Sequence, residues 1–258
     1  MKPDDESVTP PAAPSGAAVV FGDRLHRAEA FVALLADTGV THGLIGPREV
    51  PRLWDRHLMN CAVIADAFPE GATVVDVGSG AGLPGIALAL ARPDLTVRLV
   101  EPMARRTSWL EDAVDRLELR DAVSVHRGRA EELTGEVASG WVTARAVARL
   151  DKLARWCLPL LLPGGKLVAM KGRSAADELA ECRPTLRRLG VESAVVTEHG
   201  REVLPEAVLT VDCRIGEDGR ASKGARGTSR TGKPGVGGGR GSPHARGNRS
   251  AGGPSARP

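Results

Sequence analysis

Apolar residues along the chain follow two patterns, short β-branched runs and longer stretches in which they recur every three or four positions. The short runs are typical of buried strands, and the longer spacing is typical of amphipathic helices. Strands are predicted at residues 73–77, 96–100, 122–127, 141–146, 166–170, 191–197 and 203–214. Helices are predicted at residues 24–37, 51–68, 86–91, 103–118, 150–161 and 175–189.

The order of these elements predicts an α/β fold with a mostly parallel, doubly wound sheet, because strands and helices alternate along residues 71–216. The last two predicted strands follow each other without a helix, which indicates an antiparallel hairpin at the sheet edge. The helices within residues 19–70 precede the first strand, and we expect them to cap the sheet.

The two ends of the chain differ from this middle part. Residues 1–18 contain five Pro or Gly residues, which predicts a flexible leader. Residues 217–258 hold nine Lys or Arg and two acidic residues, a net charge of +7. Because the whole chain carries +3, residues 1–216 carry a net charge of −4. This Gly-, Ser- and Arg-rich tail is expected to be disordered. Its charge suits a polyanion such as RNA, and the alternative is a solubilising tail without a specific role.

Composition narrows the class of protein. The chain has 258 residues, of which 42% are hydrophobic, enough for a substantial core. Its four cysteines are far apart and form no C-x-x-C pair, which argues against a zinc site and a disulfide framework. The acidic start has no signal-peptide core, and no apolar run is long enough for a membrane. We expect a cytoplasmic, monomeric protein with no bound metal.

The candidate chemistry begins at residues 73–85, where a β-branched strand runs into closely spaced glycines and then a helix. This order of strand, glycine turn and helix is the context of a nucleotide-cofactor loop. Gly80-x-Gly82-x-x-Gly85 fits the dinucleotide pattern literally. The pattern alone therefore does not separate a dehydrogenase from another protein whose cofactor contains adenosine.

Two flanking residues favour S-adenosylmethionine over a dinucleotide, and a third suits either cofactor. Pro84 stands at the start of the helix and has no N–H for a pyrophosphate. Asp76, two residues before Gly78, would repel a pyrophosphate but suits the ammonium group of a methionyl moiety. Glu101 ends the second strand about twenty residues beyond the glycines, where an acidic side chain commonly binds a ribose in either cofactor.

The chain resembles the Rossmann-like S-adenosylmethionine-dependent methyltransferases, and within them the RsmG family, also called the glucose-inhibited division protein B family. That family methylates guanine N7 in the decoding-site loop of 16S ribosomal RNA. The resemblance covers residues 24–214, and its most specific part is the Gly-Leu-Pro-Gly loop. It is carried by Arg56-His57-Leu58, the loop from Val75 to Gly85, Arg129-Ala130-Glu131-Glu132, Ala144-Arg145-Ala146 and Lys171-Gly172.

The resemblance implies a set of cofactor-binding residues and a partner. With the loop glycines and the acidic strand ends, the set expected at S-adenosylmethionine is Asp76, Gly78, Gly80, Gly82, Leu83, Glu101, Ala130, Glu131 and Arg145. The expected partner is 16S rRNA in the 30S subunit or its precursor. One departure is Asn60-Cys61, where the family usually has an Asp-Ser pair, so any role that needs a carboxylate or hydroxyl there is open.

Missing motifs are consistent with guanine N7 as the nucleophile. After Pro10-Pro11 the chain has no Pro-Pro pair for an exocyclic-amine loop, and it has no Pro-Cys pair for cytosine C5. Guanine N7 is a bare lone pair with no proton to remove, so it needs no general base. Methyl transfer to N7 then depends mainly on alignment.

Four basic residues are candidates for contacts with the substrate. Arg145 and Lys171 end two parallel strands at the carboxyl edge, where open α/β sheets bind ligands, and are the proposed catalytic residues that orient guanine or its phosphate. The alternative is a solvated charge or an ion-pair partner. Arg52 and Arg56 are four residues apart in a predicted helix and are candidates for gripping the RNA backbone, unless that face is simply solvated.

His57 and the tryptophans have a simpler interpretation than catalysis. His57 shares a mostly apolar helical face with Trp54, so a buried, hydrogen-bonded histidine is favoured over a catalytic one. The four tryptophans can stack a flipped base but are more simply core residues, Trp109 above all.

Three rival functions stay open. The same fold can serve another RNA or small-molecule methyltransferase. A ribosome-binding assembly factor can use the cofactor for stability alone. A dehydrogenase also satisfies the glycine pattern but fits the flanking residues least well.

Overall fold

The computed structural model describes residues 10–145 and 148–218, and within them one seven-stranded sheet with the order β3-β2-β1-β4-β5-β7-β6. Five strands run parallel, and β7 is antiparallel to both β5 and β6. The predicted doubly wound sheet with an antiparallel edge hairpin is confirmed. The strands are β1 (Thr73–Val77), β2 (Thr96–Glu101), β3 (Val123–Arg127), β4 (Ser139–Arg145), β5 (Leu161–Lys171), β6 (Val191–His199) and β7 (Val208–Ile215).

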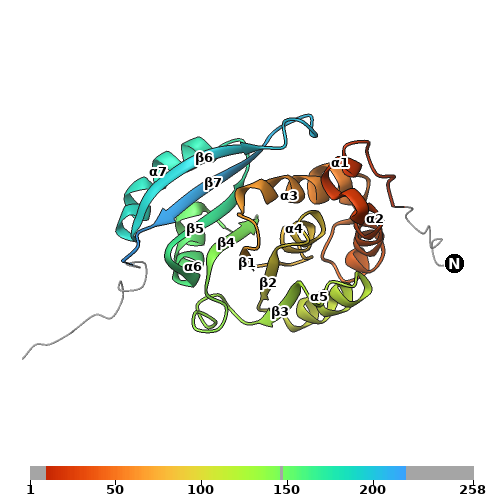
Figure 1. Cartoon of the computed structure of the whole chain (residues 1–258), viewed down its shortest axis with the longest axis horizontal. Helices are drawn as coiled ribbons and strands as arrows, with labels where there is room; N and C mark the ends of the chain where they lie inside the picture. Colours follow the sequence, from red (N-terminus) through yellow and green to blue (C-terminus); the bar gives the residue numbers. More distant parts are fainter. Residues whose placement is uncertain (1–9, 146–147, 219–258) are drawn as a thin grey trace, which may run out of the picture. The chain divides into compact units, whose positions relative to one another are not determined.

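Helices cover both faces of the sheet and bury two apolar clusters (Figure 1). On one face, α4 and α5 pack with the N-terminal helices against β1 and β2. On the other face, α6 and α7 pack against β4, β5 and β7. The helices are α1 (Ala17–Phe21), α2 (Leu25–Leu34), α3 (Met59–Ala62), α4 (Gly85–Ala91), α5 (Ala104–Arg116), α6 (Leu150–Cys157) and α7 (Ala175–Arg188).

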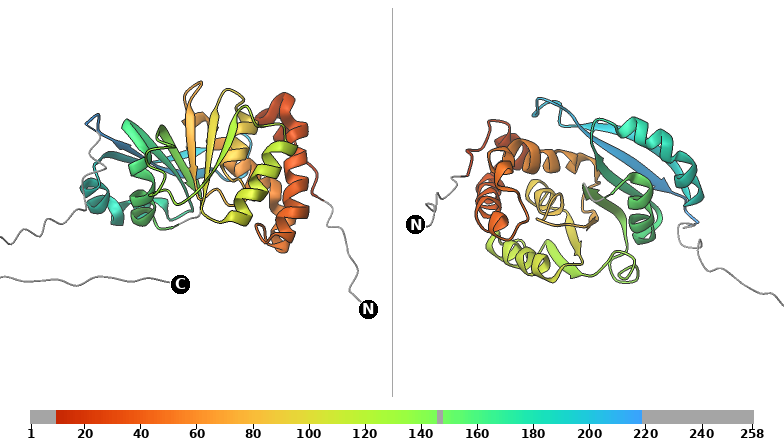
Figure 2. Two further views of the ribbon diagram at one scale, coloured as in Figure 1. Left: turned by 90° about the horizontal axis from the view of Figure 1, so that it is seen from below. Right: turned by 180° about the vertical axis from the view of Figure 1, so that it is seen from behind.

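The N-terminal helices pack on the sheet domain. Helix α2 runs beside α5 (Figure 2), where Arg27 Nη2 donates to Glu118 Oε2 at 2.6 Å. Trp109 Nε1 of α5 donates to Thr38 Oγ1 at 3.0 Å. Both contacts bridge two regions that are far apart in the sequence, so these helices belong to the same core as α4 and α5.

The predicted helix at residues 51–68 forms as four short pieces of different pitch. These are a 3₁₀ helix (η3, Pro47–Arg52), a π-helical turn (η4, Leu53–Leu58), α3, and a second 3₁₀ helix (η5, Val63–Ala67). Pro51 lies inside η3 and has no N–H for a regular α-helical bond. The expected single regular α-helix is therefore wrong, although Arg52 and Arg56 both line one cleft, described below.

The structure differs from the predictions at the leader and at residues 203–207 and agrees with them at the cysteines and Trp109. Part of the predicted leader is ordered, since α1 begins at Ala17 and Trp54 Nε1 donates to Pro11 O at 2.9 Å. Residues 203–207, predicted as strand, form a turn that contains Pro205. All four cysteines are free and buried, and Trp109 is a core residue, as predicted. Residues 1–9 of the leader and 219–258 of the tail lie outside the described residues.

No helix within the described ranges is long and apolar enough to cross a membrane.

The order of the strands marks one place in the sheet where a ligand site is expected. Chain order along the sheet reverses between β1 and β4, and open α/β sheets bind ligands outside the carboxyl ends of the strands at such a switch point.

Candidate active site

The glycine loop follows β1 at this switch point and is closed by backbone contacts. Gly78 N and Ser79 N both donate to Val100 O of β2, at 2.8 and 3.2 Å. Gly78 and Gly80 have φ of +73° and +55°, a left-handed conformation that favours glycine. A Cβ on Gly85 would lie 2.3 Å from Leu99 Cδ2, so this position has no room for a larger residue. The loop shape therefore depends on these glycines.

The start of α4 offers few free donors to a phosphate. Pro84 has no N–H, Gly85 N donates to Asp76 Oδ2 at 3.0 Å, and Ile86 N donates to Gly82 O at 2.7 Å. Because these groups are already satisfied, the usual dinucleotide site at a helix N-terminus does not form here. The prediction made from Pro84 agrees with this geometry.

Asp76 lies beneath the loop and is fully buried. Its neighbour Val74 shares its side of β1 and packs toward α4, whereas Val75 and Val77 pack toward α6. Asp76 Oδ1 has no hydrogen-bond partner among the described residues, and burial raises the pKa of this carboxyl to about 7. Its Oδ2 accepts from Gly85 N, so the carboxyl supports the start of α4 from beneath the loop.

Glu101 braces the same loop from the end of β2. Its Oε2 accepts from Gly80 N at 3.1 Å, and its Oε1 accepts from Met103 N at 3.0 Å. Arg106 Nη1 lies 3.7 Å from Oε2. Glu101 O also accepts from Gly128 N at 3.2 Å, which brings the segment after β3, with Ala130 and Glu131, next to this strand end. Glu101, predicted to hold the ribose, and the predicted cofactor residues Ala130 and Glu131 are thus neighbours.

A cleft of about 1170 Å³ opens beside the loop. It is bordered by the N-terminal helices, the ends of β4 and β5, and the turn between β6 and β7. Of the predicted site residues, the cleft is lined by Arg52, Arg56, Gly78, Gly80, Leu83, Arg145 and Lys171. The predicted residues outside its lining are Asp76, Gly82, Glu101, Ala130 and Glu131.

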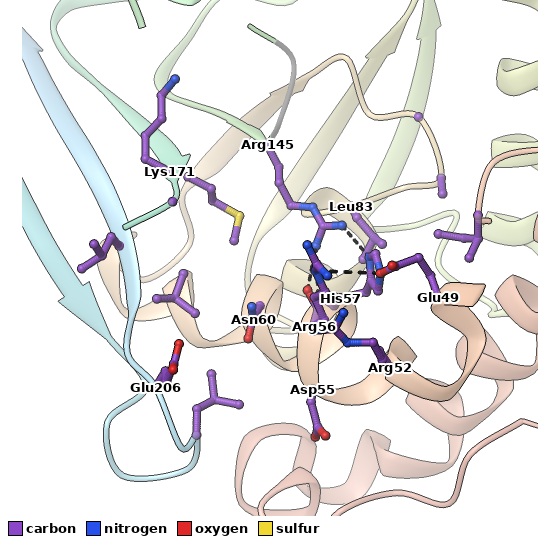
Figure 3. A pocket seen from close by; sticks show the side chains of 18 of the residues that line it. Glu49, Arg52, Asp55, Arg56, His57, Asn60, Leu83, Arg145, Lys171 and Glu206 are labelled. Atoms are coloured by element: carbon purple, nitrogen blue, oxygen red, sulfur yellow. Dashed lines mark hydrogen bonds and ion pairs between the residues drawn. The ribbon is translucent and has the colours of Figure 1, made fainter. Parts of the chain in front are cut away.

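Arg145 reaches across the cleft to the N-terminal helices (Figure 3). Its Nη2 lies 2.6 Å from His57 Nδ1, and its Nη1 lies 3.1 Å from Cys61 Sγ. Nη1 also points at the carbonyls of Arg56 and His57, each 3.4 Å away. One guanidinium therefore joins β4 to η4 and α3, inside the cleft.

His57 is buried, as predicted, but its surroundings are polar. Its Nε2 lies 2.8 Å from Glu49 Oε2, and its ring lines the cleft. Burial is the largest influence on the pKa of His57 and lowers it; the Glu49 contact opposes this shift, and the charge of Arg145 adds to it. The expected apolar surroundings are incomplete, because Glu49 of η3 and Arg145 of β4 approach the ring from outside η4.

Lys171 also lines the cleft, but its ammonium group is held elsewhere. Nζ donates to Ala148 O at 2.9 Å and to Glu178 Oε1 at 3.0 Å, and Glu178 Oε1 also accepts from Leu150 N at 2.6 Å. In Figure 3 its amine points away from Arg145 and His57. The geometry matches the ion-pair alternative for this residue.

Sequence reasoning missed Glu49 and the polar setting of His57. Arg56 Nε lies 3.8 Å from Glu49 Oε2, so one carboxylate serves both an imidazole and an arginine. The pairing was hard to foresee because His57 and Arg145 are 88 residues apart. The only signal was that both belong to segments that carry the family resemblance.

The sheet order and a glycine loop at the switch point define a Rossmann-like class I methyltransferase fold. A family model described as GidB, rRNA small subunit methyltransferase G, matches residues 24–204. The chain belongs to this family.

The chain is also similar to proteins of known name and to solved structures. A ribosomal RNA small subunit methyltransferase G from Salinispora arenicola is 54% identical over 219 residues, which cover 81% of this chain and 89% of that protein. One from Kineococcus radiotolerans is 60% identical over 175 residues, 68% of this chain and 69% of that protein. Among solved structures, a predicted O-methyltransferase from Agrobacterium tumefaciens has 18% identity and a TM-score of 0.48, covering 62% of this chain and 81% of that one.

Proposed function

We propose that this protein transfers a methyl group from S-adenosylmethionine to N7 of a guanine in the decoding-site loop of 16S rRNA, in the 30S subunit or its precursor. The observation that carries the proposal is Arg145, whose guanidinium lies in a cleft that the glycine loop also lines. The names of the relatives support small-subunit rRNA as the substrate. Guanine N7 and the decoding-site loop rest on the family resemblance.

The residues at the switch point fit a cofactor that contains adenosine but no phosphate. Gly78 and Gly80 bring backbone close to the cleft, while the first N–H groups of α4 are already used. Glu101 and the neighbouring Ala130–Glu131 segment would hold the ribose and adenine, and Leu83 would pack against the cofactor. S-adenosylmethionine, when bound, supplies an electrophilic methyl group on a sulfonium.

The protein's own contribution is alignment. Guanine N7 attacks through its lone pair and carries no proton, so no side chain has to act as a base. Arg145 would donate hydrogen bonds to guanine O6 or to its phosphate and so hold N7 in line with the methyl group. Arg52 and Arg56 line the same cleft and would contact phosphates of the RNA backbone.

Nucleoside analysis of rRNA from a strain that lacks this gene tests the proposal. We expect N7-methylguanosine in the decoding-site loop to disappear, and the wild-type gene to restore it. The Arg145→Ala variant should fail to restore it while keeping the wild-type circular dichroism spectrum. Retention of the modified nucleoside in the deletion strain contradicts the proposed function, and full restoration by Arg145→Ala contradicts the role of Arg145.

A further inference from the structure

The contact between Arg145 and His57 has a defined direction. A guanidinium only donates hydrogen bonds, so His57 Nδ1, 2.6 Å from Arg145 Nη2, must be the acceptor. The ring proton is then on Nε2 and is donated to Glu49 Oε2 at 2.8 Å. Carboxylate, neutral imidazole and guanidinium thus form one chain across η3, η4 and β4, which we call the Glu49–His57–Arg145 chain.

The other contacts of Arg145 are weaker. The two carbonyl oxygens are 3.4 Å from Nη1, near the limit of a hydrogen bond, and the Cys61 sulfur is a weak acceptor. An arginine side chain loses substantial rotamer freedom when it is fixed in one place. His57 Nδ1 is therefore the strongest of the acceptors found for this guanidinium among the described residues.

We propose that His57 is a positioning residue for methyl transfer: its neutral ring, fixed by Glu49, holds the Arg145 guanidinium in the orientation that aligns the guanine. This inference rests on the proposed function and deepens it. His57 acts through Arg145 and transfers no proton.

The arrangement predicts a loss of activity at acidic pH. The charged groups that act on the ring are Glu49 from η3, Arg56 from η4 and Arg145 from β4. The Cys61 thiol of α3 and Asp76 of β1 interact electrostatically with the same guanidinium. Protonation of Nδ1 would set an N–H against the N–H groups of Arg145. Because burial lowers the pKa of His57 from its ordinary value, kcat should fall only at pH values below the usual range of histidine titration.

Steady-state kinetics with purified 30S subunits test the role. His57→Ala should lower kcat by about 10- to 100-fold, the cost of losing a hydrogen bond to a charged group, with little change in KM for S-adenosylmethionine. His57→Asn places an amide oxygen near the Nδ1 position, so kcat should stay within about fivefold of wild type while the acid limb of its pH profile disappears. Unchanged kcat in His57→Ala, or an acid limb retained in His57→Asn, overturns the proposal.

Substituting His57 in a protein that already carries a change at Arg145 shows whether His57 acts through Arg145. Arg145→Lys keeps the charge but lacks the planar fork. Adding His57→Ala to Arg145→Lys should cost less than about twofold in kcat, because sites that act through one contact are not additive. A full, additive loss indicates a separate role for His57 and contradicts the inference.

A measurement on the free protein separates this inference from the proposed function. Nuclear magnetic resonance of the arginine side chains should show slow rotation of the Arg145 Nη groups in wild type and faster rotation in His57→Ala. The matched control is His199→Ala, which removes another buried histidine, one that pairs with Asp66 and Thr210 away from the cleft. It should leave the Arg145 signals and the pH profile of kcat unchanged.

If wild-type protein transfers no methyl group to 30S subunits, the proposed function fails. Slow Arg145 rotation that depends on His57 would still support the positioning geometry. Equal rotation in wild type and His57→Ala overturns the inference in either case.

Discussion

Arg145 and Lys171 end neighbouring strands, yet their side chains point to opposite faces of the sheet. Arg145 pairs in register with Met170, and successive residues of a strand alternate between faces. Lys171 therefore turns toward α7, where Glu178 holds it, and Arg145 turns toward the N-terminal helices. Both were predicted to lie at the carboxyl edge from their places at strand ends. Which of the two charged groups turns toward the N-terminal helices could be decided only from the strand register.

Asp76 gives the stability of the protein a pH dependence that can be tested at this one residue. Burial raises the pKa of its carboxyl from 3.8 in the unfolded reference to about 7 in the folded protein, so folding favours the protonated form. Its contribution to stability is therefore full below about pH 4 and is lost as the pH rises toward about 7. Asp76→Asn has no such titration, so its melting temperature should rise relative to wild type as pH increases from about 5 to 8.

Thermal unfolding across that pH range checks this expectation. Asp112→Asn on the exposed surface of α5 is the control and should show no such trend. A constant difference between Asp76→Asn and wild type at all pH values would show that Asp76 is ionised in the folded protein throughout.

Among the helices and strands, sequence periodicity predicted those whose bounds depend on the local sequence alone. β1 was predicted with its observed bounds, because four β-branched residues around Asp76 are followed at once by glycine. The segment from Pro47 to Ala67 was not predicted in detail, because an apolar spacing of three to four residues does not distinguish 3₁₀, α and π turns. The Glu49–His57–Arg145 chain depends on that irregular path, so periodicity alone could not reveal it.

The contact of Lys171 with Glu178 links β5 to α7 and, through Leu150 N, to the start of α6. Both side chains are mostly buried, with exposed fractions of 9% and 17%. Lys171→Met and Glu178→Gln should each lower the free energy of unfolding by about 1–3 kcal/mol, and the double variant should lose less than their sum. Urea unfolding measures all three variants. A Lys171→Met protein with wild-type stability and reduced kcat would instead support the original assignment of Lys171 to the substrate.

At the scale of the whole molecule, composition and element order predicted the sheet and its edge hairpin. The face proposed to meet RNA was harder to predict, because residues 1–216 carry a net −4 and their basic residues matter by position rather than number. Arg52 and Arg56 come together with Arg145 only through the fold, at one cleft. The basic tail beyond residue 218 remains a candidate for a further RNA contact, as composition suggested.

The salt dependence of 30S binding tests this RNA-binding face. Each arginine that neutralises a phosphate contributes about 0.7–0.9 to the slope of log K against log salt concentration. Arg52→Ala and Arg56→Ala should each reduce the slope by about that amount. Arg155→Ala, an exposed residue of α6 outside the cleft, should leave the slope unchanged. An unchanged slope in both cleft variants would place the RNA elsewhere.

The most direct test of the central claim is methyl transfer in vitro. The full-length protein is incubated with labelled S-adenosylmethionine and purified 30S subunits from a strain lacking the gene, and the labelled nucleoside is then identified and mapped. We expect about one methyl group per subunit, as N7-methylguanosine in the decoding-site loop of 16S rRNA. A labelled nucleoside of another kind, or no transfer to 30S subunits or their precursors, would contradict it.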